Sequence, residues 1–498
     1  MAQKVVVVGA GFAGLATAIR LQVAGYEVTV VEKRTKVGGR AYRLEDSGYT
    51  FDMGPSLVTL PSLFRELFAL AGRNFDDYVK LIPLDPYYRI YFPDDGYTQY
   101  IDYSGNTERM KRELAKFDPR DAERYEPFLK SIDPIFKTGY LKFGSQPFMR
   151  LWDQMKLVPQ MLKMNAILPV YQFMKGKFHH EYNRRAMGFQ SLFLGGNPAS
   201  VPAIYAMLPA IERHEGVWYA QDGGMYGVIL AFAKLYAELG GKLITNCAVK
   251  EIMIENRRAT GVRLADDSIL PADIVVSNAD TSWTYKYLIK PEHRRFWTDR
   301  KVESMKRGMS LFLLYIGTDR QYPKLFHHTL ILSEQYRETL QAIFKGKKLS
   351  EQYSIYAHAP TRSDPSMAPE GGDSIYMLIP VPTLDAGIAW ETYGAVMEES
   401  VIHFLEHDFG LEDLSKHIKV LHRMTPLDFQ DDLLAYQGST FSFEPTLLQS
   451  AYFRAHNRSE DFANLYIVGG GTHPGAGVPG VLLTAKIAAD LITGEIKG

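Results

Sequence analysis

The feature that most constrains this fold is a glycine-rich turn between two apolar runs near the start of the chain. Residues 4–33, "KVVVVGAGFAGLATAIRLQVAGYEVTVVEK", follow the order of an apolar strand, a helix pattern and a second apolar strand. Gly9 permits the tight turn, Gly11 lets a pyrophosphate approach the backbone, and Gly14 lets the helix pack on the sheet. Glu32, at the end of the second strand, is placed to accept hydrogen bonds from a ribose. This G-x-G-x-x-G with its flanking strands and acid predicts a dinucleotide-binding βαβ unit.

A second glycine pair follows directly and separates FAD from NAD as the expected dinucleotide. The segment "EKRTKVGGRAYR" places Gly38, Gly39 and Arg40 just after Glu32. Two glycines allow another close backbone approach to phosphate, and the guanidinium of Arg40 supplies a fixed positive fork. This R-x-x-x-G-G-R arrangement resembles the FAD-binding signature of the flavin amine oxidase and phytoene desaturase superfamily, and it disfavours an NAD-dependent dehydrogenase.

The same resemblance implies two further FAD contacts. "GYTFDMGPSLVTLP", residues 48–61, contains Asp52, Gly54 and Pro55 where that superfamily approaches the flavin, although Asp52 could instead cap a turn. Residues 240–280 alternate as strands, and Val249 matches the strand residue that cradles the adenine. The alternative for Val249 is an ordinary strand residue.

The C-terminal loop "LYIVGGGTHPGAGVPGVLLTAK", residues 465–486, reads as a strand, a glycine turn and a helix that runs to about residue 492. A discontinuous flavoprotein domain would bring this helix beside the first βαβ unit, with its N-terminus toward the flavin N1–C2=O edge. The residues expected to contact the cofactor are Gly470, Gly471, Gly480 and Val481.

Several segments closely resemble the carotenoid desaturases of the phytoene desaturase type. They are "TPLDF", "QGSTFSFEP", "QSAYFRAHNR" and "GTHPGAGVPGVLLTAK", and the resemblance extends over nearly the whole chain. It implies an α/β fold in which a Rossmann-like FAD-binding domain of the GR2 or flavin amine oxidase type is interleaved with a mixed-sheet substrate domain and a helical region. The expected FAD-binding segments are 1–90, 215–300 and 455–498, the helical, membrane-facing region is 91–214, and the substrate sheet is 301–454.

The activity implied by the resemblance is desaturation of a long isoprenoid hydrocarbon by hydride transfer to flavin and loss of a proton. Phytoene, converted toward neurosporene or lycopene, is the expected substrate. Such a substrate has no heteroatom, so binding must rest on apolar contact and geometry. Two residues are candidates for a catalytic part: His473 as proton acceptor, or else as a hydrogen-bonded anchor of its loop, and Glu444 as stabiliser of positive charge, or else as a buried salt-bridge partner.

Other functions remain alternatives at this stage. Within the family they are a diapophytoene or hydroxyneurosporene-type desaturase and a carotenoid isomerase. A non-catalytic flavin- or carotenoid-binding protein is the alternative from another class.

Charge and composition bear on partners and location. The chain has 56 Lys+Arg and 57 Asp+Glu, which gives a nucleic-acid partner no support, and its single cysteine, Cys247, fits a reducing cytoplasm. The apolar stretch 186–211 contains glycines and prolines and reads as two short helices rather than a membrane span. Residues 151–180 interleave apolar side chains with lysines, which suits an interfacial segment, or equally a core helix with a solvated edge. We expect a peripheral membrane protein whose electron acceptor is a quinone or oxygen.

Overall fold

The computed structural model describes residues 2–94 and 96–496, and its first architectural unit is a five-stranded parallel sheet. Its strands, in spatial order, are β10 (Lys242–Ile244), β2 (Glu27–Val31), β1 (Lys4–Val8), β14 (Ile274–Ser277) and β20 (Leu465–Ile467). The chain leaves β1 toward β2 on one side, while β14 and β20 lie on the other. The carboxyl ends of β1, β2 and β14 therefore border a crevice, where ligands of such sheets bind.

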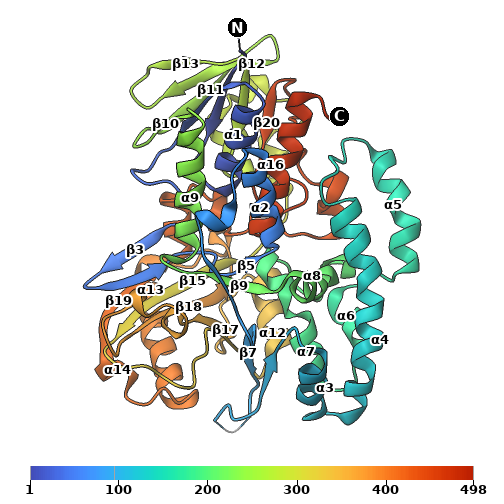
Figure 1. Cartoon of the computed structure of the whole chain (residues 1–498), viewed down its shortest axis with the longest axis vertical. Helices are drawn as coiled ribbons and strands as arrows, with labels where there is room; N and C mark the ends of the chain where they lie inside the picture. Colours follow the sequence, from blue (N-terminus) through green and yellow to red (C-terminus); the bar gives the residue numbers. More distant parts are fainter. Residues whose placement is uncertain (1, 95, 497–498) are drawn as a thin grey trace.

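Helices cover one face of this sheet and a small sheet lies against the other. The helices are α1 (Phe12–Val23), α9 (Gly224–Glu238) and α16 (Val478–Thr493), whose buried faces form one apolar core. In Figure 1 the C-terminal α16, in red, lies beside the N-terminal α1, in dark blue. The small antiparallel sheet consists of β11 (Val249–Glu255), β12 (Arg258–Leu264) and β13 (Ile269–Pro271). The strands and C-terminal helix predicted from the sequence are confirmed.

A seven-stranded, mostly antiparallel sheet forms the second unit. Its order is β19 (Ile418–Met424), β15 (Ser310–Thr318), β18 (Asp373–Val381), β17 (Ile355–His358), β16 (His328–Ile331), β7 (Tyr88–Tyr91) and β8 (Tyr100–Tyr103). Alternate side chains of β15 enter different cores: Leu311 and Leu313 pack toward the helical region, and Phe312 and Leu314 toward α13 (Trp390–His403). One face of this sheet is thus available to build an apolar chamber.

A group of helices packs over that face of the sheet. They are α3 (Thr107–Ala115), α4 (Pro119–Phe136), α5 (Leu151–Lys163), α6 (Val170–Lys175), α7 (Glu181–Gly188) and α8 (Met207–Glu215). The apolar stretch 186–211 is divided between the end of α7, short turns and the start of α8. Across residues 2–94 and 96–496, none of the helices combines the length and the apolar character that a membrane crossing requires.

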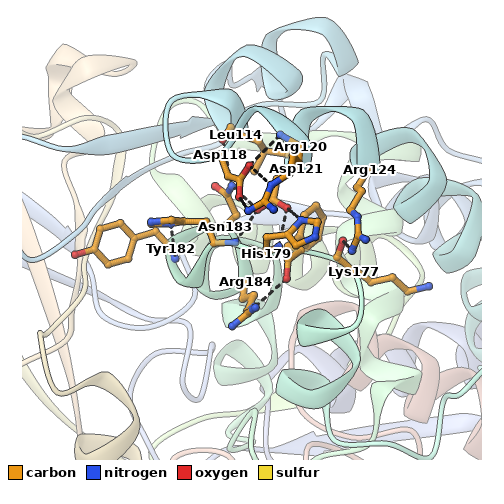
Figure 2. Close-up of polar contacts among 12 residues, drawn as sticks. Leu114, Asp118, Arg120, Asp121, Arg124, Lys177, His179, Tyr182, Asn183 and Arg184 are labelled. Atoms are coloured by element: carbon orange, nitrogen blue, oxygen red, sulfur yellow. Dashed lines mark hydrogen bonds and ion pairs between the residues drawn. The ribbon is translucent and has the colours of Figure 1, made fainter.

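A buried carboxylate joins two of these helices (Figure 2). Asp121, in the first turn of α4, is fully buried and accepts hydrogen bonds from the main-chain N–H groups of His179 and His180 at 2.6 and 2.9 Å. It also accepts one from Nδ2 of Asn183, on α7, at 2.9 Å. Asp118 caps the N-terminus of α4 through the N–H of Arg120. The adjacent histidines in the sequence therefore belong to the join between α4 and α7.

The other strands and α-helices of the described residues are short. They are β3 (Arg43–Asp46), β4 (Tyr49–Asp52), β5 (Val58–Thr59), α2 (Pro61–Leu70), β6 (Leu81–Pro83), β9 (Val217–Ala220), α10 (Thr281–Trp283), α11 (Asp299–Ser304), α12 (Tyr336–Gln341), α14 (Leu414–His417) and α15 (Pro426–Asp431).

Candidate functional site

A single cavity of about 450 Å³ runs from the crevice of the parallel sheet into the apolar chamber. Most residues that the sequence nominated as cofactor contacts line it, from widely separated parts of the chain. They are Gly9, Gly11, Glu32, Gly38, Gly39, Arg40, Gly54, Pro55, Val249, Gly470, Gly471, Gly480 and Val481. Four other nominated residues, Gly14, Asp52, Glu444 and His473, are absent from this lining.

The glycine turn after β1 has the geometry that its sequence predicts. Gly9 has φ +98° and its N–H donates to the carbonyl of Val31 at 2.7 Å, which joins the turn to β2. A Cβ on Gly14 would overlap the carbonyl oxygen of Gly9, so this glycine serves helix packing and not the cavity surface. The helix N-terminus after Gly11 has no side-chain cap, which leaves it open to an anion.

Asn278, at the end of β14, is a structural residue of this turn that the sequence analysis missed. Its Oδ1 accepts from the N–H of Gly14 at 3.0 Å, and its Nδ2 donates to the carbonyl of Val468 at 3.3 Å. The side chain thus ties the glycine turn to the end of β20. Its position directly after an apolar strand was the only available signal.

Glu32 is buried at the end of β2 with both carboxylate oxygens engaged. One accepts from the N–H of Ala10 at 2.8 Å and the other from the N–H of Arg34 at 2.9 Å. These bonds fix the carboxylate at the cavity wall, where each oxygen keeps a lone pair for a ribose hydroxyl.

Two guanidinium groups beside the second glycine pair have unused donors. Nε of Arg40 and Nη1 of Arg34 are buried and make no hydrogen bond to the described residues. Nη2 of Arg40 lies 3.8 Å from Oδ2 of Asp280. Buried N–H donors without partners are rare, and phosphate oxygens would satisfy them. The cradle therefore fits the pyrophosphate of a dinucleotide.

The C-terminal loop is held by Arg454, which the sequence analysis did not single out although it lies in the quoted "QSAYFRAHNR". This arginine is 2% exposed, and its guanidinium donates to the carbonyls of Phe443, Gln449, Gly470 and Thr472. It thereby fixes the glycine turn at the cavity wall. Helix α16 then begins at Val478 without a side-chain cap. Gly480 and Val481 in its first turn line the cavity, so the uncapped N-terminus faces the cofactor space.

Asp52 acts on a helix rather than on the cavity surface. Its carboxylate accepts from the N–H groups of Met225 and Tyr226, at 3.0 and 3.3 Å, in the first turn of α9. The geometry favours the capping alternative over direct cofactor contact.

The two catalytic candidates also lie off the cavity. The imidazole of His473 is buried against Phe148, and burial lowers its pKa to about 3. Neither of its ring nitrogens makes a well-formed hydrogen bond to the described residues. Glu444 accepts a hydrogen bond from Ser200 Oγ at 2.7 Å and forms no salt bridge with a described residue. The geometry supports neither as a catalytic group.

The far part of the cavity is mostly apolar. Its wall includes Leu57, Leu60, Phe193, Leu194, Met207, Leu208, Ile211, Leu311, Leu313, Leu378, Phe429, Leu433 and Phe441. Glu212, which also lines it, accepts from the hydroxyl of Tyr88 at 2.6 Å and from Nε2 of Gln190 at 3.3 Å. Burial raises the pKa of Glu212 to about 7. The chamber suits a long hydrocarbon, and Glu212 is a further polar group that sequence reasoning missed.

The cradle, the parallel sheet and the match between residues 12–493 and the model for flavin-containing amine oxidoreductases place the chain in that family. It is an FAD-dependent oxidoreductase. Among its relatives is a lycopene-forming phytoene desaturase from Pseudescherichia vulneris, 42% identical over 99% of this chain and 100% of that protein. A neurosporene-forming phytoene desaturase from Cereibacter sphaeroides is 40% identical over 98% of this chain and 94% of its own length. A 4,4'-diapophytoene desaturase from Methylomonas is 33% identical over 99% and 95%.

Solved structures share the fold at low sequence identity. A redesigned putrescine oxidase superposes with a TM-score of 0.66 at 14% identity, covering 99% of both chains. Cyclohexylamine oxidase from Brevibacterium oxydans gives a TM-score of 0.61 at 16% identity, again over 99% of both. The fold class expected from the sequence is confirmed.

Proposed function

We propose that this protein is a carotenoid desaturase that introduces double bonds into phytoene, toward neurosporene or lycopene. The observation that carries the proposal is the continuity of the cavity, which joins a dinucleotide cradle to an apolar chamber without an intervening wall. A hydrocarbon lying in the chamber would present its CH2–CH2 bonds to the cofactor end. The names of the three carotenoid-desaturase relatives support the same substrate class.

The residues of this chain supply binding and orientation in the proposed reaction. FAD, when bound, accepts the hydride. Glu32, Arg40 and the glycines would hold its ribose and pyrophosphate, and the N-terminus of α16 would stabilise negative charge on the reduced ring. Apolar walls such as Leu311 and Leu313 would align the chain and exclude water. We propose oxygen or a quinone as the oxidant that regenerates the cofactor.

The test is an anaerobic single-turnover assay in liposomes with FAD-reconstituted protein. Forty-carbon phytoene and thirty-carbon diapophytoene are offered separately, and flavin bleaching and product mass are followed. We expect bleaching and a loss of two hydrogens per step with phytoene. Unchanged mass with altered geometry would instead establish an isomerase, and no change with either substrate would favour a binding role.

We also propose that α5 and its neighbours contact a membrane surface. Leu151, Trp152, Met155 and Leu162 of α5 are 48%, 68%, 49% and 60% exposed, while exposed lysines flank them. Leu141 is 60% exposed, and Gly139 and Tyr140 of the same helical turn line the cavity. An apolar patch beside the cavity wall would let a lipid-dissolved substrate enter without crossing water.

A further inference from the structure

Three buried histidines lie together on the seven-stranded sheet, outside the cavity lining. His327 precedes β16, His328 begins it, and His358 ends β17 directly opposite His328. Their exposures are 7%, 1% and 1%, and one ring nitrogen of each histidine lies within 4.8 Å of one ring nitrogen of the other two. Burial lowers the pKa of all three, that of His327 to about 3, so the rings are neutral and each has one nitrogen that accepts and one that donates.

The cluster is connected to the cavity by hydrogen bonds. The Tyr356 hydroxyl lies 2.8 Å from Nδ1 of His328 and 2.6 Å from Oγ of Ser56. Tyr356 and Ser56 both line the cavity, and Ser56 directly follows Gly54 and Pro55 of the cofactor end. One phenol therefore touches the substrate space on one side and an imidazole on the other.

The cluster also leads away from the cavity. Nε2 of His358 lies 3.3 Å from Nε2 of His327, and Nδ1 of His327 lies 2.8 Å from Oγ of Ser363. Ser363 is only partly buried. Nε2 of His328 is buried and makes no hydrogen bond to the described residues, and its ring stacks on that of His358 with 5.0 Å between the ring centroids. One ring nitrogen of His328 lies within 4.8 Å of a ring nitrogen of each of the other two histidines. Two hydrogen bonds through one water span roughly 5.5 Å, so a single water would bridge His328 to the other rings.

We propose that Tyr356 is the catalytic base of the desaturation, with His328 as its proton acceptor and His358, His327 and Ser363 as the route by which the proton leaves. This inference rests on the proposed function and names a base for it. It explains why a hydrocarbon chamber is backed by a string of polar groups. It also explains why the string begins at the cofactor end.

The proposed step balances in atoms and electrons. FAD, when bound, would accept one hydrogen as hydride and be reduced, and the adjacent carbon would lose a proton. That proton binds the Tyr356 oxygen as the phenol hydrogen moves to Nδ1 of His328, and a carbon–carbon double bond forms. His328, now an imidazolium, releases its Nε2 proton toward His358 and His327 and returns to the neutral form.

The experiment measures single-turnover flavin reduction by phytoene in anaerobic liposomes for the wild type, Tyr356→Phe and His328→Asn. Asparagine keeps an acceptor for the Tyr356 hydroxyl but has no basic nitrogen. We expect both variants to reduce flavin about 100-fold more slowly, the usual scale of general-base catalysis. FAD content and phytoene binding measured by flavin fluorescence should stay at wild-type values, whereas His328→Asn should melt at a lower temperature because it shortens a buried side chain. Tyr353→Phe is the matched control, because that hydroxyl lies on the same segment and bonds Ser400 instead.

Three results would overturn the relay. The first is wild-type flavin reduction rates in both Tyr356→Phe and His328→Asn. The second is a slow reaction in Glu212→Gln only, which would move the base to Glu212. The third is a stoichiometric transition metal in purified wild-type protein that is lost in His358→Gln, because a metal on these nitrogens would block proton transfer. A wild type that never reduces flavin with phytoene would instead refute the proposed function.

Discussion

At the scale of single residues, the cofactor cradle is held by close backbone packing at glycines and by side-chain hydrogen bonds to the main chain. Gly14 packs so closely on the carbonyl of Gly9 that a Cβ would overlap it. The side chain of Asn278 hydrogen-bonds both to Gly14 and to Val468 at the end of β20. The guanidinium of Arg454 holds the C-terminal turn by donating hydrogen bonds to four carbonyl groups. These contacts determine the position of backbone N–H groups, which are the ligands that a pyrophosphate uses.

Gly14→Ala should destabilise the protein and lower its FAD content. The new Cβ overlaps the Gly9 carbonyl oxygen, and overpacking of this kind costs about 1–3 kcal/mol of unfolding free energy. Chemical denaturation and the flavin-to-protein ratio would measure both effects. Gly227→Ala, in α9, is the control, since its Cβ would make an ordinary 3.5 Å contact and helix propensity favours alanine by about 1 kcal/mol. Equal stability and FAD content in Gly14→Ala and the wild type would contradict the packing role.

Glu212 should make stability depend on pH. Its pKa is about 7 in the folded protein and 4.5 ordinarily, so between these pH values the folded state binds more protons than the unfolded state. The stabilising contribution of Glu212 to the free energy of unfolding is complete below pH 4.5 and falls as pH rises. It is lost above about pH 7, which changes the free energy of unfolding by roughly 3 kcal/mol. We expect the stability difference between the wild type and Glu212→Gln to change by this order between pH 5 and 8. Glu399→Gln, at an exposed site, should show no such change, and parallel curves for Glu212→Gln and the wild type would refute the burial argument.

At the scale of elements, the helical region depends on joins between helices that are not adjacent in sequence. The carboxylate of Asp121 satisfies main-chain donors of residues 179 and 180 and the amide of Asn183 (Figure 2). The join fixes α4 against α7, and both helices contribute to the apolar core that packs on the seven-stranded sheet.

Asp121→Ala should lower the free energy of unfolding by about 3 kcal/mol, because it leaves several buried donors without partners. Denaturant unfolding followed by circular dichroism would measure the change. Asp133→Ala, on the same helix but 40% exposed, should cost less than about 1 kcal/mol. A similar cost for the two variants would mean that the join contributes little.

At the scale of the whole molecule, α5 carries an exposed apolar patch, and Leu141, next to the cavity residue Tyr140, is exposed as well. Trp152, Met155 and Leu162 lie on the outward face of α5, and residues 154, 157 and 161 are buried on the other. The arrangement suits a protein that takes its substrate from a lipid phase.

Trp152→Glu combined with Leu162→Glu should reduce binding to liposomes at least tenfold, since two charged groups would replace apolar contact with the acyl chains. Flotation of FAD-loaded protein on vesicles with and without anionic lipid would measure it. Val396→Glu is the control, because Val396 is 55% exposed on α13, away from the patch. Undiminished flotation of the double variant would place the membrane contact elsewhere.

The sequence alone predicted the cofactor-binding turns of this protein, because the backbone conformation of a turn is determined by its own residues. The turn at residues 9–14, the glycine pair at 38–39 and the loop at 469–480 each need particular backbone conformations, and glycine and proline encode those directly. Strands β1, β2 and β20 of the parallel sheet followed from apolar patterns, and resemblance supplied the family. The boundaries between FAD-binding and substrate segments remain a prediction.

Tertiary structure decided which polar groups act together. His473 and Glu444 were nominated because they lie in family-like segments, but packing turned both away from the cavity. Tyr356, His328 and Ser56 are brought together from residues 300 apart, and no local pattern marks such a meeting. Backbone conformation is determined largely by neighbouring residues in the sequence, whereas the burial and the hydrogen-bond partners of a side chain depend on every element that packs around it.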